Sequence, residues 1–449
     1  MYKWILNLIP LAENKDINCR YLFSAILVFL LDNFPKLPSR FRLRISSKSI
    51  VQFMSLFSAN GIIFSILLPI SCAFANDIPP PYPVQPSDKL QFGRLWGQIK
   101  RASEKEDLSD MITLRRAEIS ALKDHWKSKI PTIEDFSIAN QLHTLTQKGT
   151  LEASDLGCGA AYFLKNALGT PEYVIKPIDE DVLCLNNRKQ FGSPFNNRAF
   201  RVRDHIPLYR TAQAEALSFA ISKLLGFEKL TPPTHLAIVS HEAFFDIADH
   251  LETKQPIVRE KLCSVQTYLS DVQNLLPFVQ NCMEEELSEK DILNLVDLEN
   301  FENLCLLIWI LFDTDAHAGN LYVKQNEQGT FQLLKIDNGL TFPDKNAQLL
   351  NALYYFPHAK LPLSARIRHK IANLPSDQIC QLIHLYELDG AIDAFLERTE
   401  VLQTLAKNPE NTFRDIDLRL HALSYAEGTK LALNPNLSSQ DLKNIISFE

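Results

Sequence analysis

The sequence lacks any pair of cysteines separated by two residues, the spacing on which zinc fingers and zinc ribbons depend. This absence excludes zinc-binding modules of those types. Six of the eight cysteines lie in the body of the chain, so disulfides are allowed by number, but we expect isolated buried thiols. The cysteines are scattered at Cys19, Cys72, Cys158, Cys184, Cys263, Cys282, Cys305 and Cys380.

Most of the chain also lacks a surplus of positive charge. The net charge is −7, yet residues 1–53 hold eight Lys or Arg against three Asp or Glu, which leaves a net −12 on the remainder. Nucleic-acid-binding proteins need basic surface to displace the counterions of the phosphates. The acidic body therefore excludes nucleic acid as a general partner. Internal repeats are absent too, and a hydrophobic content of 46% is enough for a sizeable core.

Charge is missing altogether from Ser49 to Asn76, a stretch of 28 residues. Small residues at Ala73 and Ala75 form an A-x-A cleavage pattern, which predicts a signal peptide cut before Asn76. Uncleaved, the same stretch is long enough to serve as a membrane anchor, and a buried core helix is the third alternative. We therefore expect the protein to be exported or membrane-anchored. The basic residues that precede the stretch are Arg40, Arg42, Arg44 and Lys48.

The segment after the uncharged stretch separates it from the rest of the chain. Residues 76–86, NDIPPPYPVQP, predict a stiff, extended linker because proline restricts the backbone. Residues 88–148 follow with many charges and with apolar residues at helical spacing, Trp126 among them. That pattern predicts an amphipathic helical lead-in without chemistry of its own.

Two glycines and a lysine form the first segment that could take part in binding or catalysis. Gly157 and Gly159 lie between two short apolar runs, and Lys176 lies in a third, which predicts strand, glycine turn, strand, turn and strand. A turn of small residues lets backbone N–H groups approach phosphate oxygens, and a strand lysine can then reach the α- and β-phosphates. Taken alone, this pattern is more often an ordinary tight turn with a solvated lysine.

An amphipathic helix is predicted next, from Gln213 to its stop at Gly226. Glu215 in its first turn is a candidate ion-pair partner for Lys176, as in kinases generally. A surface glutamate is the alternative. We expect the buried side of this helix to comprise Ala214, Leu217, Phe219, Ala220 and Leu224.

Two polar loops flank a predicted hairpin near the middle of the chain. The first loop carries Asp315, His317 and Asn320, and the second carries Asp337 before a glycine. Phosphoryl transfer requires an acid at the attacking hydroxyl and hard oxygen ligands for magnesium. Asp315 is the candidate catalytic acid, and Asn320 and Asp337 are the candidate metal ligands, for Mg²⁺ or alternatively Mn²⁺. We expect His317 to brace the catalytic loop by hydrogen bonding. The ordered series predicts an ATP-dependent kinase site.

These motifs resemble the phosphatidylinositol 3-/4-kinase superfamily, most closely its type II and plant gamma-type 4-kinases, over roughly 270 residues. The family pattern Asp-Arg-His-Ala-Gly-Asn corresponds to 315–320, and Ile-Asp-(Asn/His)-Gly-Leu-x-x-Pro corresponds to 336–343. Further matches lie at 175–180, 231–234 and 356–363. The resemblance implies an α+β, bilobal protein-kinase-like fold with a small β-rich N-lobe and a helical C-lobe. It also implies a hinge at 264–269, in which the backbone of Gln266, Thr267, Tyr268 and Leu269 binds adenine.

The sequence departs from the family at two places. Ala316 replaces the arginine of the catalytic loop, and the glycine turn holds Cys158 and Ala160 where Gly or Ser is common. The groups required for transfer remain. The predicted segments are a signal or anchor region (1–75), a Pro-rich linker (76–87), a lead-in (88–148), the N-lobe with hinge (149–270), the C-lobe (271–432) and a tail (433–449).

Three functions agree with these observations: a phosphatidylinositol (4-)kinase, a protein kinase of the same architecture, and a nucleotide-binding protein with weak or no activity. Between Pro343 and Pro362 the only Lys or Arg residues are Lys345 and Lys360. A multiply phosphorylated headgroup would need more cations, so an unphosphorylated inositol lipid or membrane surface is the expected partner beside ATP. Exported proteins usually meet no ATP. A working kinase behind a signal peptide therefore suggests that the protein is delivered into a second cell, lies in a lumen supplied with ATP, or is held by a membrane anchor with its kinase domain facing ATP.

Overall fold

The computed structural model describes residues 107–133, 146, 148–189, 201–203, 205–246, 258–425 and 427–446, all within one compact unit. The predicted signal or anchor stretch, its cleavage site and the Pro-rich linker lie outside these residues. Within the described part of the chain, no helix combines the length and apolar character that crossing a bilayer requires. The first described element is helix α6 (Asp107–Ile133), which contains the fully buried Trp126 of the predicted lead-in.

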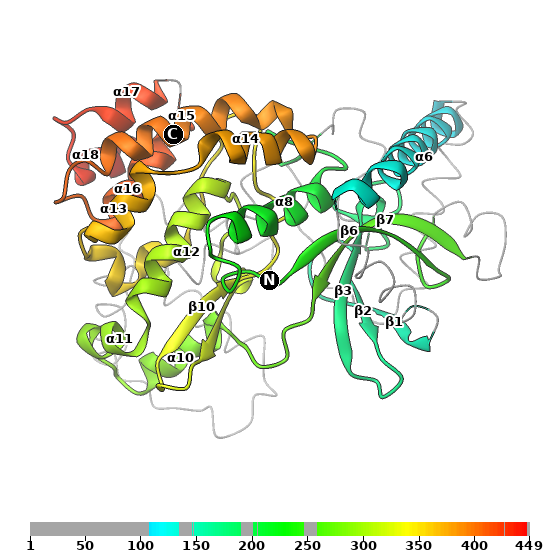
Figure 1. Ribbon diagram of the computed structural model, residues 1–449, viewed down its shortest axis with the longest axis horizontal. Coiled ribbons are helices and arrows are strands. Elements are labelled where there is room, and N and C mark those ends of the chain that lie inside the picture. Colours follow the sequence, from blue (N-terminus) through cyan, green and yellow to red (C-terminus); the bar gives the residue numbers. More distant parts are fainter. Residues whose placement is uncertain are drawn as a thin grey trace, which may run out of the picture. The chain divides into compact units, whose positions relative to one another are not determined.

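A five-stranded antiparallel sheet forms the β-rich part of the fold (Figure 1). Its β2–β3 turn shows how the sequence sets the register: the side-chain oxygen of Asn166 accepts from the backbone N–H groups of Leu168 and Thr170, and Gly169 takes a positive φ of 79°. The strands, in spatial order, are β1 (Thr150–Ala153), β2 (Tyr162–Lys165), β3 (Pro171–Pro177), β7 (Arg259–Thr267) and β6 (Thr234–His241).

Helix α8 (Thr211–Leu224) packs against β6 and β7. Ala214 and Leu217 are buried as predicted, but Leu224 is exposed, and Glu215 is buried rather than on the surface. The prediction of the buried side was therefore wrong in part. Glu215 is buried because α8 is covered on two sides, by the sheet and by the segment after Asp337, where Thr341 Oγ1 lies 3.1 Å from a serine hydroxyl of the helix.

A mainly helical part follows from residue 275 onward, so the elements divide into β-rich and helical portions, in agreement with the predicted α+β class. Helix α12 (Leu298–Leu311) is its apolar centre, and it begins where the Asp297 side chain accepts from the Asn300 N–H. The other helices are α10 (Leu275–Glu284), α11 (Glu289–Leu295), α13 (Ala365–Ala372), α14 (Ser376–Leu385), α15 (Ile392–Leu405), α16 (Phe413–Ala422), α17 (Gly428–Leu433) and α18 (Ser439–Ile446).

Two small sheets lie outside the five-stranded sheet. The predicted hairpin is present as β9 (Leu321–Gln325) and β10 (Phe331–Lys335), with β8 (Gln273–Asn274) paired to β9. A separate hairpin consists of β4 (Arg201–Arg203) and β5 (Ile206–Pro207). All six described cysteines are free, and four of them are buried. Cys158 is exposed, which corrects the expectation of a buried thiol there: it lies in the glycine turn and not in a strand.

Candidate functional site

The glycine turn is held by side chains that follow it in the sequence. Lys189 Nζ donates to the carbonyls of Leu156, Gly157 and Gly159, the last two at 3.2 and 3.0 Å. Gly157 has a φ of +76°, and a Cβ at Gly159 would lie 2.7 Å from an Asp181 carboxylate oxygen, so both positions favour glycine. Because Lys189 holds the carbonyls, the turn has a defined conformation. The sequence interpretation missed Lys189, since no local motif marks it.

Lys176, Glu215 and Asp337 come together from three separate elements. Lys176 Nζ lies 2.5 Å from Glu215 Oε1 and 2.9 Å from Asp337 Oδ1, and Ser264 Oγ donates to Glu215 Oε2 at 2.8 Å. The predicted ion pair between β3 and α8 is therefore present. It positions a lysine at the edge of the sheet beside the segment that carries Asp337.

The charged groups in this cluster shift one another's pKa values. Burial opposes the charged form of Lys176, but Asp337 and Glu215 together raise its pKa above the usual value. Burial raises the pKa of Glu215. Burial would also raise the pKa of Asp337, but the charge and hydrogen bond of Lys176 outweigh it and lower that pKa to about 2. Asp337 is therefore ionised at neutral pH, as a metal ligand must be.

The loop after α12 arranges Asp315, His317 and Asn320 around one another. Asn320 Nδ2 donates to the backbone oxygen of Asp315 at 3.0 Å and to its Oδ2 at 3.1 Å. His317 Nδ1 accepts from the Gly319 N–H at 3.0 Å, which is the bracing contact expected of it. Its Nε2 lies 3.8 Å from Asp315 Oδ2. Asp315 and Asn320 are therefore joined by hydrogen bonds, and His317 lies beside them, held by its own bond to the Gly319 N–H.

A buried ion pair joins this loop to the loop of Asp337. Asp313 Oδ1 accepts from the Asp315 N–H at 2.7 Å, and its Oδ2 lies 2.5 Å from Lys335 Nζ. Lys335 also donates to the backbone oxygen of Asp337 and to Asn338 Oδ1, at 3.1 and 2.9 Å. Asp337 itself has a φ of +59°, an uncommon conformation for aspartate. Neither Asp313 nor Lys335 was assigned a role from sequence.

The predicted hinge offers fewer backbone groups than expected. Gln266 lies in the interior strand β7, which pairs with a strand on each side, and its Nε2 donates to Thr234 Oγ1 at 3.2 Å. The N–H groups of Thr267 and Tyr268 donate, at 2.8 Å each, to the carbonyls of Pro233 and Glu172. These donors are engaged within the sheet. An adenine contact through this segment would therefore involve the carbonyls of 267–268 and Leu269.

Asn320 and Asp337 offer the oxygen ligands that Mg²⁺ or Mn²⁺ would need. The Ile336 N–H donates to the Asn320 carbonyl at 3.0 Å, so the residues that bear the two ligands are neighbours in space. In the described residues, no group of three or more His, Cys, Asp or Glu side chains could hold a metal by itself. The pair nonetheless fits magnesium, which commonly takes one or two protein ligands and completes its shell with phosphate oxygens and water.

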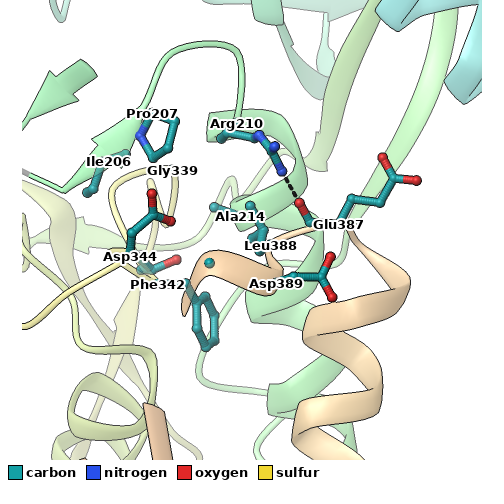
Figure 2. A pocket seen from close by; sticks show the side chains of 12 residues that line it. Ile206, Pro207, Arg210, Ala214, Gly339, Phe342, Asp344, Glu387, Leu388 and Asp389 are labelled. Atoms are coloured by element: carbon teal, nitrogen blue, oxygen red, sulfur yellow. Dashed lines mark hydrogen bonds between the residues drawn. The ribbon is translucent and has the colours of Figure 1, made fainter. Parts of the chain in front are cut away.

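A small cavity of about 150 Å³ lies beside the start of α8. Figure 2 shows that Arg210, Ala214, Gly339 and Asp344 line it together with the loop that contains Glu387. Arg210 Nη1 donates to the Glu387 carbonyl across one side of this cavity. The contact links the helix that carries Glu215 to the helical part of the fold.

Comparison with known proteins supports a kinase-like class. No protein-family model matches the chain. Phosphatidylinositol 4-kinase gamma 5 of Arabidopsis thaliana is 27% identical over 240 residues, which cover 51% of this chain and 35% of that protein. Gamma 1 of the same plant is 27% identical over 272 residues, covering 58% and 41%, and gamma 2 is 24% identical over 271 residues, covering 58% and 46%. The chain thus spans less than half the length of these relatives.

Two solved structures are also similar to the chain. A crystal structure of the Golgi casein kinase gives a TM-score of 0.35 at 14% identity, covering 68% of this chain and 82% of that one. The Golgi casein kinase with Mn/ADP bound gives 0.34 at 15% identity, covering 81% and 98%. At such TM-scores the likeness assigns neither a site nor a substrate. The similarity to the plant gamma-type proteins amounts to identities of 24–27% in these three comparisons.

Proposed function

We propose that the chain is an ATP-dependent phosphotransferase that phosphorylates a hydroxyl of phosphatidylinositol. The resemblance to 4-kinases favours the 4-hydroxyl as the acceptor. The observation that carries this proposal is the convergence of Lys176, Glu215 and Asp337 next to the loop of Asp315. Phosphoryl transfer depends on positioning and on charge stabilisation more than on covalent chemistry, and these four residues supply both.

Each residue has a defined part in the proposed reaction. Lys176, held by Glu215, binds the α- and β-phosphates of ATP. Asp315 orients the acceptor hydroxyl and accepts its proton. The oxygen of that hydroxyl forms a bond to the γ-phosphorus of ATP while the bond from the γ-phosphorus to the β,γ-bridging oxygen breaks, and ADP leaves. Asn320 and Asp337 would hold the magnesium, which neutralises charge on the phosphates when bound.

The proposed acceptor class follows from charge near the site. Of the two lysines between Pro343 and Pro362, Lys360 is paired with Glu289, which leaves Lys345. So little positive charge in this segment favours an inositol lipid without further phosphates. The names of the curated relatives support the same acceptor. Export or anchoring remains a prediction, and with it the proposal that the protein acts where ATP is supplied: in a second cell, in a lumen or at a membrane.

One experiment separates the candidate acceptors. The full chain is incubated with γ-labelled ATP, Mg²⁺ and either phosphatidylinositol–phosphatidylcholine vesicles or casein, and the label is followed into lipid and protein. We expect label in phosphatidylinositol phosphate, and none with the Asp337→Asn variant. Label in casein alone would instead make the protein a protein kinase. Binding of ATP without transfer to either acceptor would indicate a nucleotide-binding protein.

A further inference from the structure

The hairpin of β4 and β5 lies against the loop of the candidate catalytic aspartate. Arg203 Nη1 is 3.0 Å from Asp315 Oδ1, and the same nitrogen donates to the backbone oxygen of Thr314. The turn of the hairpin is also held, because the His205 carbonyl accepts from the Asp344 N–H at 2.7 Å, in the segment that follows Asp337. Both side chains of the ion pair are largely buried, with 25% of Arg203 and 18% of Asp315 exposed.

The two carboxylate oxygens of Asp315 therefore have different partners. Oδ1 faces Arg203, and Oδ2 accepts from Asn320 Nδ2 at 3.1 Å. A carboxylate held at both oxygens cannot rotate freely about its terminal torsion, so its direction toward an acceptor is defined. The Asn320 contact is local, five residues away. The Arg203 contact is supplied by an element more than a hundred residues earlier in the chain.

The residue after Asp315 cannot provide the same contact. Ala316 is fully buried, its carbonyl accepts from the Ala352 N–H at 2.9 Å, and its side chain is a methyl group. No cation is therefore available from position 316, whereas the guanidinium of Arg203 reaches both a backbone oxygen and the carboxylate. Arginine suits this task because its planar group carries several donors in a fixed arrangement and is permanently charged.

We propose that Arg203 is a positioning residue that sets the orientation of Asp315 for phosphoryl transfer, in place of a cation within the catalytic loop. This inference rests on the proposed function. Arg203 acts through Asp315 and not on the nucleotide. It follows that its loss lowers turnover while ATP binding is preserved, and that the effect requires an intact Asp315.

The kinetic test compares Arg203→Gln and Arg203→Lys with Arg116→Gln in the full chain. Arg116 is the matched control because it is an arginine on helix α6 that pairs with another acid, Asp246, at 3.6 Å. We expect Arg203→Gln to lower kcat about 10- to 100-fold, the range in which misplaced groups affect catalysis, with the KM for ATP changed less than about twofold. Arg203→Lys should recover part of the rate, and Arg116→Gln should resemble wild type.

A double-mutant cycle decides whether Arg203 works through Asp315. In an Asp315→Asn background, Arg203→Gln should cause little further loss. An equal loss in both backgrounds, or no loss in either, would overturn the proposal.

Amide hydrogen exchange separates this inference from the proposed function. Arg203→Gln should accelerate exchange in residues 312–320, while Arg116→Gln should leave this loop unchanged. If the wild-type chain transfers phosphate to no acceptor, the proposed function fails and the exchange result alone decides the positioning role. Unchanged exchange in residues 312–320 would then refute it.

Discussion

Lys335 Nζ lies 2.5 Å from Asp313 Oδ2, and neither side chain is exposed to solvent. The pair joins the two loops of the candidate site, since Asp313 accepts from the Asp315 N–H and Lys335 donates to the Asp337 carbonyl. Burial raises the pKa of Asp313, and the charge of Lys335 opposes that rise. A buried pair of this kind costs free energy to desolvate, so its value lies in holding the loops in one geometry.

Removing one partner of this pair should destabilise the fold. Lys335→Met leaves the Asp313 carboxylate buried without its cation, and we expect the free energy of unfolding to fall by about 3–5 kcal/mol. Chemical denaturation measures this change. The double variant Asp313→Asn/Lys335→Met should be more stable than the sum of the two single effects predicts, because it leaves no uncompensated charge. Strict additivity would show that the two side chains are not coupled.

Asp337→Asn should abolish metal-dependent transfer and leave the fold intact. The change removes the ionised ligand while keeping the size of the side chain, and a loss of roughly a thousandfold corresponds to the several kcal/mol that a metal contributes. Transfer is measured with Mg²⁺ and with Mn²⁺, and folding by thermal unfolding. Asp271→Asn is the control, because Asp271 is an exposed acid paired with Lys324. Wild-type turnover in Asp337→Asn would refute the assignment.

Lys189→Ala should weaken ATP binding more than it affects turnover. Its ammonium group donates to three carbonyls of the glycine turn, and loss of a charged hydrogen-bond donor costs about 1.5–3 kcal/mol. We expect the KM for ATP to rise about 10-fold or more. Lys165→Ala serves as control, since Lys165 pairs with Glu152 on the neighbouring strands and makes none of the turn's contacts. Equal effects of the two substitutions would argue against a specific role for Lys189.

The stability of the helical part should depend on the ionisation of Asp417. Burial raises the pKa of Asp417 to about 7, even though Trp309 Nε1 and Asn351 Nδ2 donate to it. Between about pH 4, the pKa of an unfolded aspartate, and pH 7, the folded state binds more protons than the unfolded state, so stability falls as pH rises.

Asp417→Asn cannot ionise, so the stability difference between wild type and this variant isolates the effect. The free energy of unfolding of the wild type should fall relative to that of the variant from about pH 4 to pH 7, and the difference should then stay constant. Denaturant unfolding at intervals across this range measures it. A difference independent of pH would refute the raised pKa. Because Asn351 forms a bridge with Ala316, the same titration should also affect the loop of Asp315.

The local features of the protein follow from its amino-acid sequence. Apolar runs separated by turn residues predicted strands β1 to β3 and the β9–β10 hairpin, and the order of Lys176, Glu215, Asp315 and Asp337 predicted a kinase-type site. The strands and the hairpin depend on residues close together in the chain, where backbone preferences and side-chain periodicity act directly, whereas the kinase-type site was predicted from the order of its motifs along the chain. The strand lysine, the helix glutamate and the aspartate do meet in the structure.

The distant side chains that support the site are identified by the packing of the elements and not by sequence patterns. Lys189, Arg203 and Lys335 each hold a loop, yet no local pattern distinguishes them from other basic residues. Such contacts depend on how the elements pack, because a side chain acquires its partner only when segments far apart in sequence are brought together. The same packing buried Glu215 and engaged the hinge amides of Thr267 and Tyr268 within the sheet, neither of which spacing along the chain can specify.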